Sequence, residues 1–136
     1  MKETLDEQSR LGLMRYRIER ADETMKEAAV LAERGFYNAT VNRLYYACFY
    51  ATQALLLKHH IAATTHAGVK SMLGLHFISK GIISIDHGKT FNTLFEKRHS
   101  SDYEAFAYCD KALVDDLTPL AEAFIQRIKE LLEENK

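Results

Sequence analysis

The stretch LYYACFYATQALLL, residues 44–57, is apolar around almost the whole circumference of a helix. It is shorter than the roughly 20 residues that span a bilayer, and a Gln and a Thr interrupt it. A helix that is apolar on nearly every side is buried among other elements. In a chain of only 136 residues, such burial also suggests that one side of this helix faces a second copy of the chain.

Helix-length periodic patterns fill most of the remaining chain, and alternating strand patterns are lacking. We expect helical segments over residues 4–34, 38–60, 66–80, 89–103 and 111–134. Gly35 and Gly81 suit helix C-termini, and Thr65 and Asp110 suit N-caps. The sequence therefore predicts one domain over residues 1–136, an all-α, antiparallel four- to five-helix up-and-down bundle that dimerises.

Two positions leave the helix boundaries open. The first segment is either continuous or interrupted near Gly12. Pro119 either kinks the last helix or occupies the first position of a new helix that Thr118 caps.

The composition is that of a soluble globular protein, with 47% hydrophobic and 27% charged residues. The net charge of −1 gives no basic footprint that demands duplex nucleic acid, although a local patch could still contact RNA. Cys48 and Cys109 lack a C-x-x-C spacing and fit buried thiols in a reducing compartment. Because the charged N-terminus lacks the pattern of a signal peptide, we expect a cytoplasmic protein.

Arg43 lies on the otherwise apolar second segment, where an unpaired guanidinium would be costly to bury. An acidic side chain such as Asp102, the carbonyls of a helix end or an anionic ligand could satisfy it. Tyr46 and Tyr50 share its face at helical spacing and could stack on a base or a guanidinium. A structural ion pair and an anion-binding site are both consistent with this pattern.

The fourth segment ends in RHSSDY, residues 98–103, an unbroken row of hydrogen-bonding side chains. Arg98 and Asp102 are four residues apart and share a helix face, and His99 and Tyr103 form the adjacent pair. The row is either a solvated helix end or a site that binds or cuts a phosphodiester. In a nuclease, the arginine would stabilise charge on phosphate and the histidine would act as acid or base.

The histidines give little indication of a metal site. None of the six forms an H-x-x-x-H or H-x-x-E-H pattern, and Glu-x-x-His occurs once, from Glu96 to His99. A carboxylate-bridged metal site in a bundle needs two such pairs with further glutamates. We therefore expect neither a metal nor another cofactor.

Three segments carry a family resemblance: RLYYA at 43–47, THAGV at 65–69 and RHSSDY at 98–103. Together they resemble the HEPN domain, across about residues 15 to 132. The resemblance implies a helical bundle that dimerises. It also implies membership of a toxin–antitoxin pair, in which many relatives are partnered by a minimal nucleotidyltransferase. Many active relatives are metal-independent RNases with an arginine followed, after four to six residues, by a histidine at the dimer cleft.

This chain departs from the RNase motif. Arg98 matches the arginine, but Tyr103, Glu104 and Ala105 occupy the window for the histidine. His99 directly follows Arg98, so on a helix it points about 100° away and could substitute only in a different cleft geometry. In some related pairs AMP is attached to a tyrosine near this motif, and Tyr103 is the nearest equivalent here.

The leading hypothesis is a HEPN-type dimer that acts as one half of a two-component system. Its cleft would present a set of side chains to RNA, a nucleotide or a partner protein: Arg43, Tyr46, Tyr50, Arg98, Asp102 and Tyr103. The first alternative is an RNase toxin in which Arg98 and His99 are catalytic. The second is a structural interaction bundle in which these polar groups serve packing.

Overall fold

The computed structural model describes residues 6–103 and 108–134, apart from the side chains of residues 99–103. Within that part of the chain every regular element is a helix, which confirms the all-α prediction. The elements in order are α1 (Glu7–Glu33), α2 (Tyr37–Lys58), α3 (His66–Leu73), the π-helical turn η1 (Gly74–Ile78), α4 (Ile85–Tyr103) and α5 (Lys111–Glu133).

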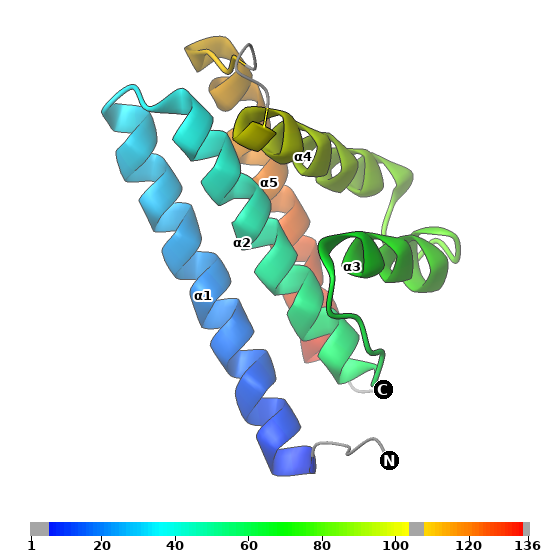
Figure 1. The fold of residues 1–136 in the computed structure, drawn as a ribbon. Helices are drawn as coiled ribbons and strands as arrows, with labels where there is room; N and C mark the ends of the chain where they lie inside the picture. The colour runs from blue at the N-terminus through cyan, green and yellow to red at the C-terminus, as the bar shows by residue number, and fades with distance from the viewer. Residues whose placement is uncertain (1–5, 104–107, 135–136) are drawn as a thin grey trace.

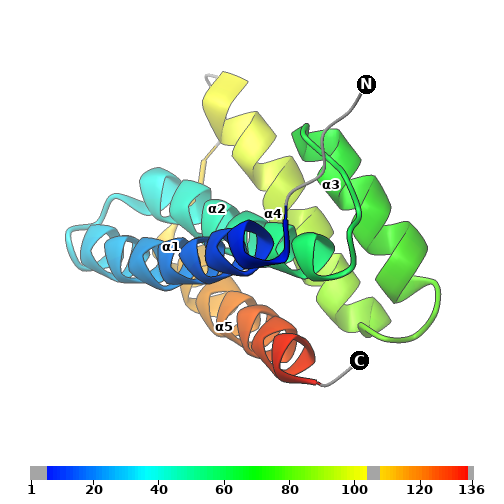
Figure 2. The same cartoon turned by 90° about the horizontal axis from the view of Figure 1, so that it is seen from below.

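Helix α2 is the centre of the bundle. It contacts α1, α3, α4 and α5, whereas α1 and α5 barely touch each other. Figures 1 and 2 show α1 antiparallel to α2 on one side, α5 on a second side, and α3 with α4 on a third. Twelve of the 22 residues of α2 are buried, so helices of the same chain cover most of its apolar surface.

The burial of α2 does not by itself require a dimer. Helices of the same chain already pack around α2, and a second copy is not needed to bury it. Dimerisation stays a prediction that rests on the family resemblance.

The predicted helix ends are formed by the expected residues. Gly35 has a φ of +79° and follows α1, and the Phe36 N–H donates to the Leu31 carbonyl at 2.9 Å. The Thr65 hydroxyl accepts from the Gly68 N–H at 2.9 Å and so caps α3. Asp110 caps α5 in the same way, through the Leu113 N–H at 2.9 Å.

The third helix differs from the prediction in its second half. The α-helix ends at Leu73, and a π-helical turn follows, closed by the Ser79 N–H on the Gly74 carbonyl at 2.9 Å. The extra residue in that turn rotates the side chains beyond it by about 100°. Phe77, at the end of this turn, is buried in the core.

The structure places no helix boundary at Gly12 or at Pro119. Helix α1 runs without a break through Gly12, and α5 runs through Pro119. Thr118 does not cap a new helix, because its hydroxyl donates back to the Val114 carbonyl at 2.8 Å. Pro119 has no N–H to donate to the carbonyl of Asp115, and the helix tolerates that loss at its surface.

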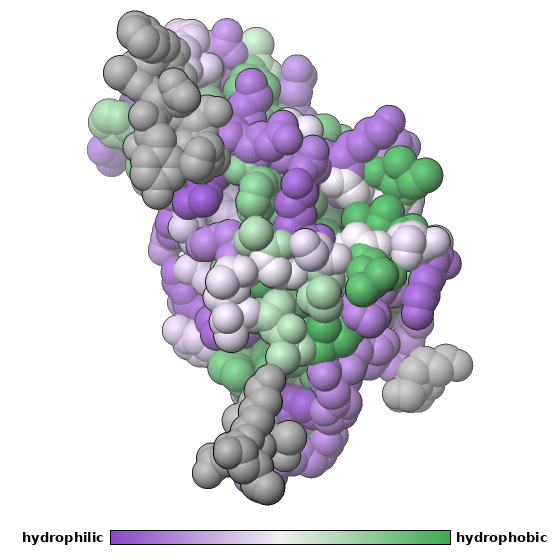
Figure 3. Space-filling view, turned by 45° about the vertical axis from the view of Figure 1, so that its right-hand side comes forward, coloured by the Kyte–Doolittle hydropathy of each residue, from purple (hydrophilic) through white to green (hydrophobic). Residues whose placement is uncertain are grey.

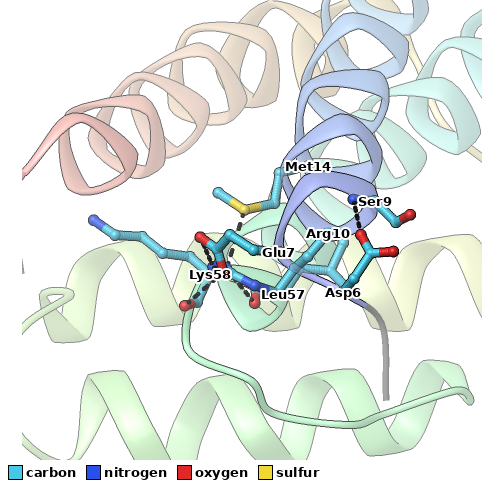
Figure 4. Close-up of polar contacts among 7 residues, drawn as sticks. All are labelled: Asp6, Glu7, Ser9, Arg10, Met14, Leu57 and Lys58. Carbon is cyan, nitrogen blue, oxygen red and sulfur yellow. Dashed lines mark hydrogen bonds and ion pairs between the residues drawn. The ribbon is translucent and has the colours of Figure 1, made fainter. Parts of the chain in front are cut away.

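Arg10 joins the start of α1 to the end of α2 (Figure 4). Its guanidinium is buried and donates to the carbonyls of Leu57 and Lys58 at 3.2 and 3.3 Å. Glu7 pairs with the same guanidinium at 2.5 Å. Carbonyls at a helix C-terminus lack partners within the helix, so a cation there satisfies them and offsets the helix dipole.

We expect Arg10→Met to destabilise the protein by roughly 1–3 kcal/mol, because the end carbonyls of α2 lose a charged donor while the apolar stem is kept. Urea denaturation followed by circular dichroism measures the change. Arg15→Met is the matched control, since Arg15 is exposed on the same helix. Equal stability of the two variants would show that the Arg10 contacts contribute nothing.

Candidate functional site

Arg98 of α4 lies over the ring of Tyr45 of α2. Its guanidinium carbon is 5.5 Å from the ring centroid, within the range of a cation–π contact. Tyr45 is completely buried, and Arg98 is half-buried. The ring also packs against Phe91 and Phe95 of α4, at 5.8 and 6.0 Å between centroids. The aromatic core therefore fixes the surface on which the arginine lies.

The Tyr45 hydroxyl is 2.8 Å from Nδ1 of His66, the first residue of α3. Burial raises the pKa of the Tyr45 phenol well above its usual range, so the phenol keeps its proton. Burial and the nearby Arg98 charge lower the pKa of His66, so the imidazole is neutral at pH 7. A phenol that donates to Nδ1 leaves the imidazole proton on Nε2, whereas an imidazole protonated on Nδ1 donates to the phenol oxygen.

A second cation lies beside this pair. Lys70, one turn after His66 on α3, has its ammonium 4.8 Å from the centroid of the Phe95 ring. Its spacing from His66 puts both side chains on one face of the helix. Lys70 and Phe95 are both partly exposed, so the charge is accessible to solvent.

The contacts continue along α2. The Tyr46 ring lies 5.6 Å from His66 and 6.0 Å from Tyr50. Arg43 lies over Tyr46 at 5.1 Å, and Arg20 of α1 lies over Tyr50 at 5.4 Å. We call this connected set the cation–aromatic strip: Arg98, Lys70, Phe95, Tyr45, His66, Tyr46, Arg43, Tyr50 and Arg20.

Arg43 has protein partners of its own. Its guanidinium forms an ion pair with Glu27 of α1 at 3.3 Å and donates to Asn42 Oδ1. Of the partners considered from the sequence, an acidic side chain is therefore present, and it comes from α1. The pair is about a quarter exposed at Arg43 and half exposed at Glu27, so it contributes little to stability.

The structure connects Arg43, Tyr46, Tyr50 and Arg98 through aromatic contacts, and their role in binding stays a prediction. The side chains of His99, Asp102 and Tyr103 lie outside the described residues, and only their helical backbone is placed. Their roles stay predictions.

Sequence reasoning missed His66, Tyr45 and Lys70 as members of the site. His66 stands in the THAGV segment and was noticed only as part of a motif. Its hydroxyl partner lies 21 residues earlier in the chain, and no periodic pattern connects the two. The sequence shows tyrosines at positions 45 and 46, but because both are the same residue type it does not indicate which of them is buried.

Figure 3 turns the side of the molecule that carries α3 and α4 toward the viewer. Hydrophilic residues surround a smaller apolar area on this face. Among the described residues, no group of three or more His, Cys, Asp or Glu side chains is arranged to hold a metal ion. None of the helices in the described part of the chain combines the length and apolar character that crossing a membrane requires.

The fold and the three segments define a helical-bundle protein of the HEPN class. The HEPN domain model matches residues 14–131, and the chain belongs to this family. A UPF0332 protein of Thermotoga maritima is 32% identical over 124 residues, which cover 91% of this chain and 94% of that protein. A protein of Methanocaldococcus jannaschii named "Putative toxin MJ0605" is 35% identical over 120 residues, 86% of this chain and 87% of its own length.

A solved structure has the same fold. The crystal structure of ST0689, an archaeal HEPN homologue, superposes with a TM-score of 0.72 over 88% of this chain and 98% of that chain. The two sequences are 16% identical in the superposition, so the likeness concerns the fold alone.

We expect the pKa of His66 to lie below 6.5, and Arg98→Met to raise it by removing the nearby positive charge. Because the native imidazole resists protonation, unfolded chains take up the extra proton, and stability falls as the pH drops through about 6.5. NMR titration of the His66 ring protons measures the pKa. Lys97→Met, an exposed neighbour on α4, should leave it unchanged. A wild-type value at or above 6.5 contradicts the described environment.

Proposed function

We propose that this protein is the toxin component of a toxin–antitoxin-type pair and that the cation–aromatic strip binds single-stranded RNA. The observation that carries the proposal is Arg98, held over a buried tyrosine whose hydroxyl is bonded to His66. Two relatives in Methanocaldococcus jannaschii carry the name "Putative toxin", and these names support the biological role.

The chemistry of the strip suits an unpaired strand. Arg98 and Lys70 supply positive charge for phosphates at fixed positions. Tyr46 and Tyr50 are partly exposed rings, and unpaired bases stack on such rings without strong sequence preference. Because the net charge of the chain is only −1, attraction of RNA has to come from these local cations and not from the protein as a whole.

The proposal includes a homodimer in which two copies of the strip line one cleft. Asp102 and Tyr103 follow Arg98 on α4, and we assign them to the same cleft. A minimal nucleotidyltransferase is the partner that we infer for the pair, since many members of the family have one.

The position of His66 suits phosphate binding better than general-base catalysis. We assign the Tyr45 phenol as the donor to Nδ1 of His66, which puts the imidazole proton on Nε2. A general base needs a free lone pair, whereas an N–H can donate to a phosphate oxygen. His66 therefore fits a phosphate-binding role, and nuclease activity would rest on His99.

We expect Arg98→Ala and Tyr46→Ala each to weaken binding of a fluorescent single-stranded RNA by about tenfold, through loss of a phosphate contact and of base stacking respectively. Fluorescence anisotropy at fixed salt measures the affinity, and Lys97→Ala is the control on the same helix. Unchanged binding in both variants would favour the structural alternative. Incubation with total RNA, alongside Arg98→Ala and His99→Ala, tests cleavage directly.

We expect the purified protein to sediment as a dimer, with about twice the 15.6 kDa mass of one chain. Analytical ultracentrifugation at several concentrations measures the mass. A single-chain mass throughout would contradict the shared cleft while leaving RNA binding by one strip open to the anisotropy test.

A further inference from the structure

A second surface lies between α1 and α5. Both helices pack on α2 and barely touch each other, and a hollow of about 680 Å³ remains between them. Its lining comes from Met25–Glu33 of α1 and Val114–Glu122 of α5. We call this hollow the α1/α5 groove. It shares no lining residue with the cation–aromatic strip, so a ligand in the groove does not occupy the strip.

The floor of the groove is apolar and made of small side chains. Ala28 and Val114 are almost completely buried there, and Ala32 is partly buried beside them. Ala29 and Pro119 form exposed parts of the walls. Small residues at such positions allow another backbone to approach closely, at the 8–10 Å between axes that is typical of packed helices.

The length of the groove matches a short helix. The lining segment of α1 spans eight residue steps, about 12 Å at 1.5 Å per residue, and that of α5 spans the same. Two turns of a guest helix cover this length with apolar residues at i, i+4 and i+7. An ion pair between Lys129 of α5 and Asp22 of α1, at 2.8 Å, joins the two helices just beyond one end.

The rim of the groove carries an excess of negative charge. Glu33, Asp115 and Glu122 line it, against the single lysine Lys26 among the lining residues. Lys111 pairs with Asp115, whereas Glu33 and Glu122 form no ion pair with another described residue. Pro119 adds to this character, because it offers no N–H to the carbonyl of Asp115 on the groove wall.

We propose that the α1/α5 groove docks a two-turn amphipathic helix of a partner protein, with lysine or arginine on both sides of its apolar stripe. The apolar floor takes the stripe, and the Glu33 and Glu122 carboxylates receive the flanking cations. Complementary charge fixes the register and the choice of partner more than it adds affinity.

The probe is a pair of short stapled helical peptides with leucine at i, i+4 and i+7 and either lysine or glutamate at the flanking positions. We expect the lysine peptide to bind the full-length protein about tenfold more tightly than the glutamate peptide, with the difference shrinking at high salt. Fluorescence anisotropy measures both affinities. Absent or equal binding of the two peptides overturns the proposal.

Two variants, each with a matched control, test whether the peptide binds in the groove. Ala29→Trp fills the groove and should abolish binding, and Ala123→Trp, an exposed alanine outside the lining, should not. Glu33→Lys combined with Glu122→Lys should reverse the preference between the peptides without burying any group. Glu19→Lys with Glu133→Lys, also exposed, is the matched control. If Ala29→Trp instead converts a dimer into a monomer, the occupant is a second copy and the proposal is wrong.

Discussion

The burial of α2 is the constraint on which the rest of the structure depends. The side chains of α2 are apolar on nearly all sides, so α1, α3, α4 and α5 must each pack an apolar face against it. Once these helices pack around α2, the positions of their ends and of their polar side chains are largely determined. The cap that Arg10 supplies to the end of α2 follows from the same requirement, because carbonyls next to a packed helix end still need donors.

The polar features of the candidate site follow from that burial. Tyr45 places a hydroxyl inside the bundle, where an unpaired donor would be costly, and His66 at the start of α3 satisfies it. The hydrogen bond holds α3 against α2 and puts Lys70 next to Phe95. Arg98 then lies on the ring of Tyr45. The same few side chains thus pack the core and form the proposed binding surface, so we expect a substitution of one of them to affect both.

The molecule carries two surfaces of opposite character. The cation–aromatic strip places arginine and lysine side chains of α2, α3 and α4 over aromatic rings of α2 and α4. The α1/α5 groove is apolar at its floor and acidic at its rim. The proposed function requires contact with both an RNA and a partner protein, and these two surfaces share no residue.

The sequence alone determined the helices, most of their caps and the central place of residues 44–57, because periodicity, glycine and capping side chains act over a few neighbouring residues. It also identified Arg43, Tyr46, Tyr50 and Arg98 as polar groups that needed an explanation. Only the tertiary structure decided that Glu27 pairs with Arg43, that His66 is hydrogen-bonded to Tyr45 and that α1 and α5 stand apart. These pairings join residues distant in the chain, and their geometry is set by how helices pack around α2, which no local pattern encodes.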